Sequence, residues 1–290
     1  MANLKEIRNR ITSVGSTMQI TSAMKMVSAA KLKRAQDAIL QLRPYADKLR
    51  EILQNISSNM DSSLGGDLTV QREIKKQLLI VITSNRGLAG AFNSSVVKKA
   101  NSVISEAKEA GIEVELLTIG KKGFDLLKKQ EKIYKNCSSL WENVDYAEIA
   151  ALSEEVVEKF IHSEFDQVRI IYNQFKNAAT QIVTNEQYLP VELAVSEQQD
   201  ATTLADYIFE PSKEKILTDL IPQTLKTQLY KTILDSNAAE HGARMTAMHK
   251  ATDNADALRK ELVLQYNKER QAAITNEILE IVGGAEALDS

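Results

Sequence analysis

Apolar residues recur at alternating three- and four-residue intervals along the first 57 positions. They are Leu4, Ile7, Ile11, Val14 and Met18, and then Leu32, Ala35, Ile39, Leu42, Ala46, Leu49, Leu53 and Ile56. This heptad spacing places one apolar seam on an α-helix and winds two such helices into a left-handed coiled coil. The pattern therefore predicts one helix over residues 3–57, about 80 Å long at a rise of 1.5 Å per residue.

The heptad seam is interrupted in its middle. Its positions there hold Thr21, Lys25 and Ser28, and the apolar residues stand beside them, at Ile20, Ala23, Met24, Val27 and Ala30. We interpret this as a hydrophobic stripe that has moved around the helix, as a third surface packing on this stretch would require. Pro44 also lies within the pattern and predicts a kink, because it removes one backbone donor.

The last third of the chain has the same helical character. Its apolar residues are Leu225, Leu229 and Ile233, then Met245, Met248, Ala255, Leu258, Leu262 and Tyr266, then Ile274, Ile278 and Ile281. Pro211 and Ser212 predict a helix start, with Ser212 as the N-cap. Pro222 predicts a kink or a restart, and Gly283-Gly284 predicts the end. A helix over 212–282 would be about 105 Å long.

Helices of these lengths exceed the diameter of a small domain, about 30 Å, so much of each must project from it. We expect an antiparallel two-helix coiled coil, because the two helices flank the middle of the chain. The alternative is a helical bundle that is broken at the two prolines.

Strand and helix patterns alternate in the middle of the chain. Strands are predicted at 78–83, 113–119, 168–172 and 181–184, and helices near 92–110 and 146–162. Such alternation favours a mostly parallel sheet, hence a central Rossmann-like α/β domain. The predicted organisation is an N-terminal helix (1–57), a connector (58–76), the α/β domain (77–195), a second connector (196–211) and a C-terminal helix (212–290).

Composition agrees with long helices, since aromatic residues make up only 5% and there are just 4 Pro and 11 Gly. Residues 1–50 carry ten Lys or Arg and three acids, a charge of +7, which leaves -10 of the total of -3 for the remainder. This basic segment could meet nucleic acid, anionic lipid or an acidic protein surface, or simply be a solvated helix face. No apolar run approaches the 18 or so residues that span a bilayer, and no signal peptide is visible, so we expect the protein to act in the cytoplasm.

The chain offers weak candidates for a catalytic or ligand site. The glycine-bearing turn Ser84–Asn93 matches neither G-x-G-x-x-G nor a P-loop, so we expect its glycines to serve tight packing rather than nucleotide binding. His162, His241 and His249 lack partners at metal-ligand spacing. Cys137 is the only cysteine and is interpreted as a structural or surface thiol. We therefore predict no catalytic, cofactor or metal site, and the acidic chain disfavours nucleic acid.

Segments at both ends and in the middle resemble the gamma subunits of bacterial F-type ATP synthases. They are Leu4–Ile11 (LKEIRNRI), Gln19–Val27 (QITSAMKMV), Arg43–Ala46 (RPYA), Ser84–Asn93 (SNRGLAGAFN), Ala239–Met245 (AEHGARM), Ala251–Ala255 (ATDNA) and Tyr266–Glu277 (YNKERQAAITNE). Two differences accompany the resemblance. Ala89 stands where many relatives carry Cys, and the cysteine-bearing insert of the chloroplast subfamily is absent.

The resemblance implies a central rotary shaft that couples ion flow through a membrane ring to ATP synthesis or hydrolysis in other subunits. Its implied partners are three alpha and three beta subunits, an epsilon subunit and the membrane c-ring, with no direct insertion into the bilayer. The implied location is peripheral, on the cytoplasmic face of the bacterial plasma membrane. The chain itself would not be an enzyme.

The resemblance also assigns residues to these partners. Contacts with the alpha–beta ring are implied for Met24, Lys25, Glu240, Arg244, Arg270, Gln271, Thr275 and Glu277, and contacts with the c-ring or epsilon for Tyr207, Phe209 and Glu210. Two other functions remain open at this point: an enzyme that uses a nucleotide at the Ser84–Asn93 turn, and a static coiled-coil tether.

Overall fold

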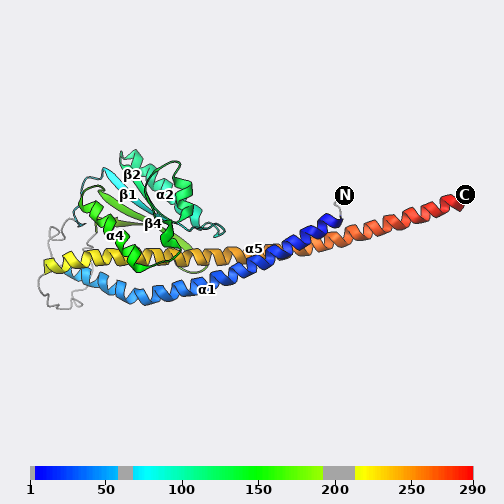
Figure 1. Cartoon of the computed structure of the whole chain (residues 1–290), viewed down its shortest axis with the longest axis horizontal. Helices are drawn as coiled ribbons and strands as arrows, with labels where there is room; N and C mark the ends of the chain where they lie inside the picture. Colours follow the sequence, from blue (N-terminus) through cyan, green and yellow to red (C-terminus); the bar gives the residue numbers. More distant parts are fainter. Residues whose placement is uncertain (1–3, 58–67, 192–212, 290) are drawn as a thin grey trace. The chain divides into compact units, whose positions relative to one another are not determined.

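The computed structural model describes residues 4–57, 68–191 and 213–289. The chain forms two compact units. One, called here the coil unit, comprises residues 1–28 with 245–290, and the other, the α/β unit, comprises residues 29–244. Helix α1 (Leu4–Ser57) and helix α5 (Lys213–Asp289) each contribute to both units (Figure 1). The two long terminal helices predicted from the sequence are therefore confirmed.

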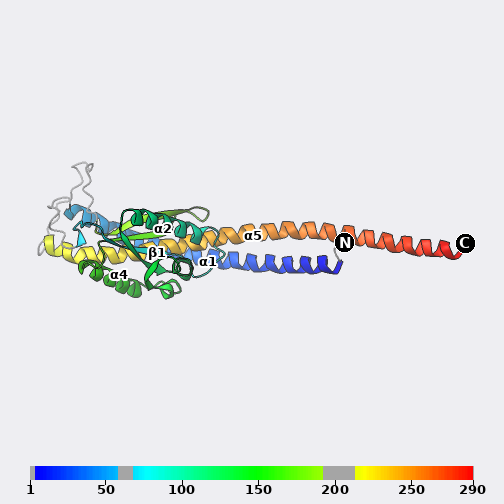
Figure 2. The ribbon, with the colours of Figure 1, turned by 90° about the horizontal axis from the view of Figure 1, so that it is seen from above.

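The coil unit is a pair of antiparallel helical segments, one from α1 and one from α5, that lie side by side in Figures 1 and 2. Their buried residues are Ile7, Thr21 and Ser28 from α1 and Met248, Ala255 and Leu262 from α5. The two hydroxyl oxygens of Thr21 and Thr252 are 2.8 Å apart and form a hydrogen bond between the helices. Apolar and small polar residues therefore share one seam.

The prediction that the heptad seam fails at Thr21 and Ser28 is wrong, whereas the third surface expected on this stretch stays a prediction. Thr21 and Ser28 are 9% and 2% exposed and stay in the seam, whereas Ile20 and Val27 are 60% and 57% exposed. Small side chains can occupy a close helix contact, and both hydroxyls also bond to the preceding turn, Thr21 to the Met18 carbonyl and Ser28 to the carbonyl four residues earlier. The seam continues through polar residues, and the apolar residues beside it are left exposed.

The α/β unit is built on a five-stranded sheet in the order β3-β2-β1-β4-β5. The strands are β1 (Lys76–Ile82), β2 (Glu113–Ile119), β3 (Lys132–Asn136), β4 (Gln167–Phe175) and β5 (Gln181–Leu189). All neighbours pair in parallel except β4 and β5, which are antiparallel. The helices between them are α2 (Phe92–Glu109), α3 (Lys121–Leu127) and α4 (Tyr146–Ile161), with a short 3-10 turn, η2, at Ser138–Trp141. A Rossmann-like domain with a mostly parallel sheet is confirmed.

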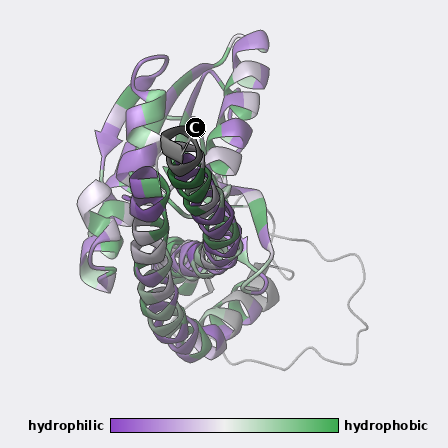
Figure 3. Cartoon of the chain, turned by 90° about the vertical axis from the view of Figure 1, so that its right-hand side faces the viewer, coloured by the Kyte–Doolittle hydropathy of each residue, from purple (hydrophilic) through white to green (hydrophobic). Residues whose placement is uncertain are grey.

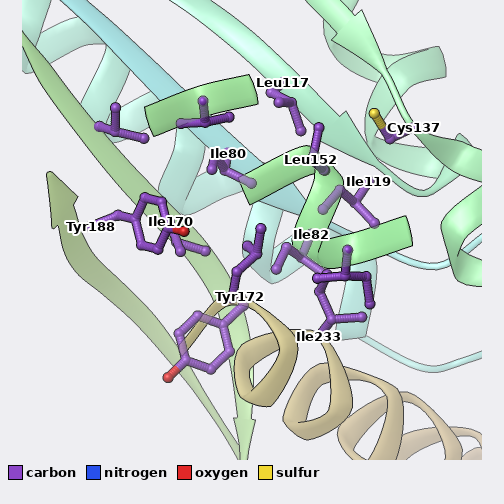
Figure 4. Close-up of a cluster of buried hydrophobic side chains, with 14 of the residues drawn as sticks. Ile80, Ile82, Leu117, Ile119, Cys137, Leu152, Ile170, Tyr172, Tyr188 and Ile233 are labelled. Atoms are coloured by element: carbon purple, nitrogen blue, oxygen red, sulfur yellow. The ribbon is translucent and has the colours of Figure 1, made fainter. Parts of the chain in front are cut away.

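Strand β1 is buried on both faces, which explains its unbroken apolar run. Leu79 and Val81 pack in the cluster that includes α2 residues. Ile80 and Ile82 point to the opposite face and join a larger cluster with α4 and α5 (Figure 4). Helix α5 supplies Leu225, Leu229 and Ile233, which are at most 1% exposed, so it is a core element of this unit.

Several boundaries differ from the sequence predictions. Helix α5 continues past Gly283-Gly284 to Asp289, so the predicted end there is wrong. A glycine within a helix costs only about 1 kcal/mol and is not by itself a stop. Both long helices also continue through their prolines, Pro44 and Pro222, so the second is not a restart. The predicted N-cap Ser212 and the connector over 196–211 lie outside the described residues, and the proposed domain boundaries stay predictions.

Elements α3 and β3 were not predicted. Strand β3 reads Lys-Ile-Tyr-Lys-Asn and lies at the sheet edge, so it lacks an apolar run. Hydrophobic and hydrophilic residues are mixed along the helices in Figure 3. Over the described residues, none of the helices combines the length and apolar character of a membrane span.

Candidate functional site

The Ser84–Asn93 turn, which follows β1, is held by its own polar side chains. The Asn93 amide oxygen accepts from the Ser84 backbone N–H at 2.9 Å, and the Ser84 hydroxyl donates to the Arg86 carbonyl at 2.6 Å. Asn85 joins the turn to the next crossover, because its amide oxygen accepts from the Lys121 backbone N–H at 2.8 Å. The turn is therefore held by hydrogen bonds within it and by one to the backbone of Lys121.

Close packing depends on a glycine after β2 rather than on Gly87 of the turn, where a Cβ would meet only the Lys122 side chain at 3.9 Å. A Cβ placed on Gly120 would lie 2.0 Å from the Thr83 carbonyl oxygen, and the residue has a φ of 102°. Strands β1 and β2 can approach this closely at their carboxyl ends only because position 120 carries no side chain.

A buried polar cluster joins α5 to the turn. Glu240 and Arg244 are 5% and 8% exposed and form an ion pair one helical turn apart. The other Glu240 carboxylate oxygen accepts from the Trp141 indole N–H at 2.7 Å. The Arg244 guanidinium donates to the carbonyl oxygens of Gly87 and Arg86. We call this set, with Trp141, Glu240, Arg244 and the two carbonyl groups, the Arg244 cluster.

Two residues of the Arg244 cluster are among the predicted contact residues. The sequence resemblance assigned Glu240 and Arg244 to the alpha–beta ring, but their side chains are buried within the α/β unit and bonded to groups of this chain. Their assignment to the alpha–beta ring stays a prediction. Sequence reasoning missed Trp141, since only the folded chain brings η2 beside α5.

The other predicted ring contacts lie in the coil unit. Met24 and Lys25 are partly exposed on α1, and Arg270, Gln271, Thr275 and Glu277 are exposed on α5. From residue 271 to residue 284, every side chain of α5 is exposed. Tyr207, Phe209 and Glu210, predicted to meet the c-ring or epsilon, lie outside the described residues.

The coil unit also leaves large apolar side chains exposed on both helices. On α1 these are Ile20, Met26 and Val27, and on α5 they are Leu264, Ile278, Leu279, Ile281 and Val282, each more than half exposed. We therefore take the exposed apolar side chains of the two helices as the candidate site of interaction with another chain.

The remaining titratable candidates are isolated. Burial lowers the pKa of His241, and its buried Nδ1 has no hydrogen-bond partner. Burial raises the pKa of Cys137, a residue 7% exposed, in keeping with a structural thiol. Among the described residues, no three or more His, Cys, Asp or Glu side chains gather closely enough to hold a metal ion. Burial also raises the pKa of Asp235 to about 6, which the sequence did not signal.

Comparisons with known proteins extend over nearly the whole chain. A family model described as "ATP synthase" matches residues 3–288. The ATP synthase gamma chain of Flavobacterium johnsoniae is 61% identical, and that of Christiangramia forsetii is 54% identical, over 100% of both chains in each case. The gamma chain of Geobacter metallireducens is 45% identical over 99% of both chains.

Solved structures give the same result. The chain resembles part of the central stalk and c-ring of the Tetrahymena thermophila mitochondrial ATP synthase, with a TM-score of 0.58 and 26% identity over 80% of this chain and 99% of that chain. It also resembles part of the rotor of the Euglena gracilis mitochondrial ATP synthase, with a TM-score of 0.66 over 93% of this chain and 98% of that chain. The latter pair is 20% identical, so it bears on the fold alone.

Proposed function

This chain belongs to the ATP synthase gamma family and is the central rotary shaft of that complex, and on this premise we propose how its two units divide the work. The coil unit turns inside a ring of three alpha and three beta subunits, and the α/β unit receives torque from the membrane side. The observation that carries the proposal is the exposed apolar and polar surface of the coil unit over α1 and the far end of α5.

ATP is made or hydrolysed in the beta subunits, and this chain acts without catalytic residues of its own. Two observations support this division. The polar side chains of the Ser84–Asn93 turn are engaged with one another, and two carbonyl groups of the turn accept from Arg244. These side chains and carbonyl groups of the turn are thus engaged within the fold.

The contact with the beta subunits is assigned to two groups of residues. Met24 and Lys25 lie next to the exposed apolar side chains of α1, where a basic residue would meet an acidic loop. Arg270, Gln271, Thr275 and Glu277 lie on the fully exposed part of α5. The small apolar residues near Val282 suit rotation in an apolar collar, because strong polar bonds there would favour one angle.

On the membrane side, Tyr207, Phe209 and Glu210 are assigned to contacts with the epsilon subunit or the c-ring. This assignment rests on the resemblance of Asp206–Pro211 to the family's lower segment. The protein would then be peripheral, on the cytoplasmic face of the bacterial plasma membrane, as one subunit of the membrane-bound complex.

The test is ATP hydrolysis by the cognate alpha and beta subunits, mixed with or without this chain. We expect a stable complex with a much higher steady-state rate when the chain is present. A chain that neither joins the complex nor changes the rate would overturn the proposal. A complex that assembles but shows the same rate would favour the static coiled-coil tether instead.

Gln271→Leu tests the assigned contact on α5. We expect hydrolysis and ion pumping to fall about fivefold, equivalent to about 1 kcal/mol at an interface residue, while the complex still assembles. Gln265→Leu is the matched control, since Gln265 is also an exposed glutamine of α5. Equal activity of both variants and the wild type would contradict the assignment of Gln271.

A further inference from the structure

We propose that the Arg244 cluster is a positioning device that fixes α5 against the sheet, so that torque passes between helix and sheet within the α/β unit. The inference rests on the proposed rotary function and adds to it residues that face no other subunit. In this proposal Glu240 and Arg244 pass torque between α5 and the sheet, rather than contact the alpha–beta ring.

The Arg244 cluster lies at the carboxyl end of the central strand β1. The order β3-β2-β1-β4-β5 reverses at β1, whose neighbours are β2 on one side and β4 on the other. In open α/β sheets, the crevice at the carboxyl end of such a strand is where a ligand binds. Here Arg244 of α5 reaches that end and donates to the carbonyl groups of Arg86 and Gly87. The chain's own helix thus occupies the place of a ligand.

The bonds of the Arg244 cluster are charge-assisted and directional. Elsewhere α5 packs on the sheet mainly through apolar side chains such as Leu225, Leu229 and Ile233, and apolar contact has little directional preference. Hydrogen bonds to β5, from Gln228 to Glu186 and from the Tyr188 hydroxyl to the Leu225 carbonyl, are separate from the cluster. The hydrogen bonds of the cluster are directional, and a guanidinium has a planar, fixed set of donors. Both carboxylate oxygens of Glu240 are in use, one by Arg244 and one by Trp141, so η2, α5 and the turn form one connected chain of bonds.

Helix α5 closely approaches the β4–β5 turn at a glycine between the two charged residues. A Cβ on Gly242 would lie 3.2 Å from the Cα of Ala178, which is a tight contact. Glu240 and Arg244 flank this glycine on the same helix. Rotation of α5 about its axis or sliding along it would therefore break polar bonds and also bring a larger side chain against the turn.

A merely stabilising ion pair makes different predictions. A buried pair can often be replaced by apolar residues without loss of stability, and an i,i+4 pair on a helix tolerates exchange of its two members. A positioning role requires a guanidinium at residue 244, facing the carbonyl groups, and a carboxylate at residue 240, facing Trp141. The exchange Glu240→Arg with Arg244→Glu keeps the ion pair within the helix. It loses the hydrogen bond from Trp141 and the hydrogen bonds to the two carbonyl groups of the turn.

The experiment compares ion uptake with ATP hydrolysis in vesicles that contain the whole assembled complex. For Arg244→Leu and for the exchanged pair, we expect ion uptake per ATP hydrolysed to fall at least about twofold, the lower end of what single contacts contribute in coupled networks. Lys226→Ala is the control, because Lys226 ties α5 to α4 through an ion pair with Glu154 that is more exposed. It should keep the wild-type ratio.

A conservative variant separates the geometry of the cluster from its charge. Arg244→Lys keeps a cation one helical turn from Glu240 and loses the planar set of donors that reaches the two carbonyl groups. We expect the complex with Arg244→Lys to assemble and its ratio to fall as in Arg244→Leu. A wild-type ratio in Arg244→Lys would overturn the inference.

Two further outcomes would also overturn the inference. One is a wild-type value of ion uptake per ATP hydrolysed in Arg244→Leu, and the other is a wild-type value in the exchanged pair. Either result, obtained in a complex whose wild type hydrolyses ATP and pumps ions, would leave the rotary function intact. A wild-type chain that supports neither activity would instead count against the proposed function itself.

Discussion

Asp235 is a buried aspartate. It is 9% exposed on α5, and burial raises its pKa to about 6, with Lys231 and Arg43 partly opposing the shift. The folded chain therefore holds a proton between pH 3.8 and about pH 6 that the unfolded chain has released. The free energy of unfolding therefore falls as the pH rises through this window. Above about pH 6, the folded chain bears the full cost of burying the ionised Asp235 carboxylate.

Asp235→Asn removes this cost. At pH 7.5 we expect the α/β unit to become more stable, by about 1–3 kcal/mol, and at pH 4 to show little change. Urea unfolding followed by the fluorescence of Trp141, the single tryptophan, measures the unit directly. Asp219→Asn, at an exposed acid of the same helix, should have no effect at either pH. Equal destabilisation by Asp235→Asn at both values would contradict the assigned cause.

Gly120 tests the close approach of β1 and β2. We expect Gly120→Ala to destabilise the α/β unit by more than about 1 kcal/mol, because its Cβ would meet the Thr83 carbonyl group and its φ is positive. Gly87→Ala is the control, as its Cβ would meet only the Lys122 side chain at 3.9 Å, and it should stay within about 0.5 kcal/mol. The same fluorescence measurement distinguishes them, and equal effects would contradict the packing account.

At the scale of residues, contacts between side chains that are distant in the chain could not be predicted from local patterns. The spacing of the glycines in the Ser84–Asn93 turn predicted no standard phosphate motif, and this stays a prediction. Glu240 and Arg244 were assigned to another subunit, because no local signal shows that α5 lies on the sheet. Their burial and the Trp141 partner exist only once η2 and α5 are brought together.

At the scale of elements, apolar runs predicted the strands of the sheet centre and heptads predicted the long helices. Edge strand β3 was missed because its residues alternate little and face partly to water. The interruption in the α1 seam is only apparent, because small hydroxyl residues fill a seam as well as apolar ones. The apolar residues beside it are exposed, where the sequence predicts that a third surface packs.

Two isoleucines of α1 separate these roles. Ile7 is 2% exposed in the seam, and Ile20 is 60% exposed beside it. We expect Ile7→Ala to lower the amide hydrogen-exchange protection of residues 4–18 at least about tenfold, because removal of a buried side chain weakens the helix contact. Ile20→Ala should leave the protection unchanged in the isolated chain, yet weaken association with the beta subunits. The reverse pattern would contradict the seam as described.

At the scale of the whole molecule, the account makes this chain a moving part rather than a catalyst. The family membership rests on matches along residues 3–288, and the division of work between the two units rests on what each exposes or buries. The coil unit exposes the side chains that we assign to contacts with the beta subunits. The α/β unit keeps its polar cluster inside, where it can carry load between elements.

The most direct test of the central claim is observation of rotation in single complexes. The alpha and beta subunits are fixed to a surface, and a probe is attached at Leu126→Cys, an exposed position of α3 in the α/β unit. The account predicts that ATP drives the probe in one direction in regular steps, and that rotation stops when ATP is removed. A complex that hydrolyses ATP at its full rate while the probe keeps one fixed orientation would contradict the rotary shaft.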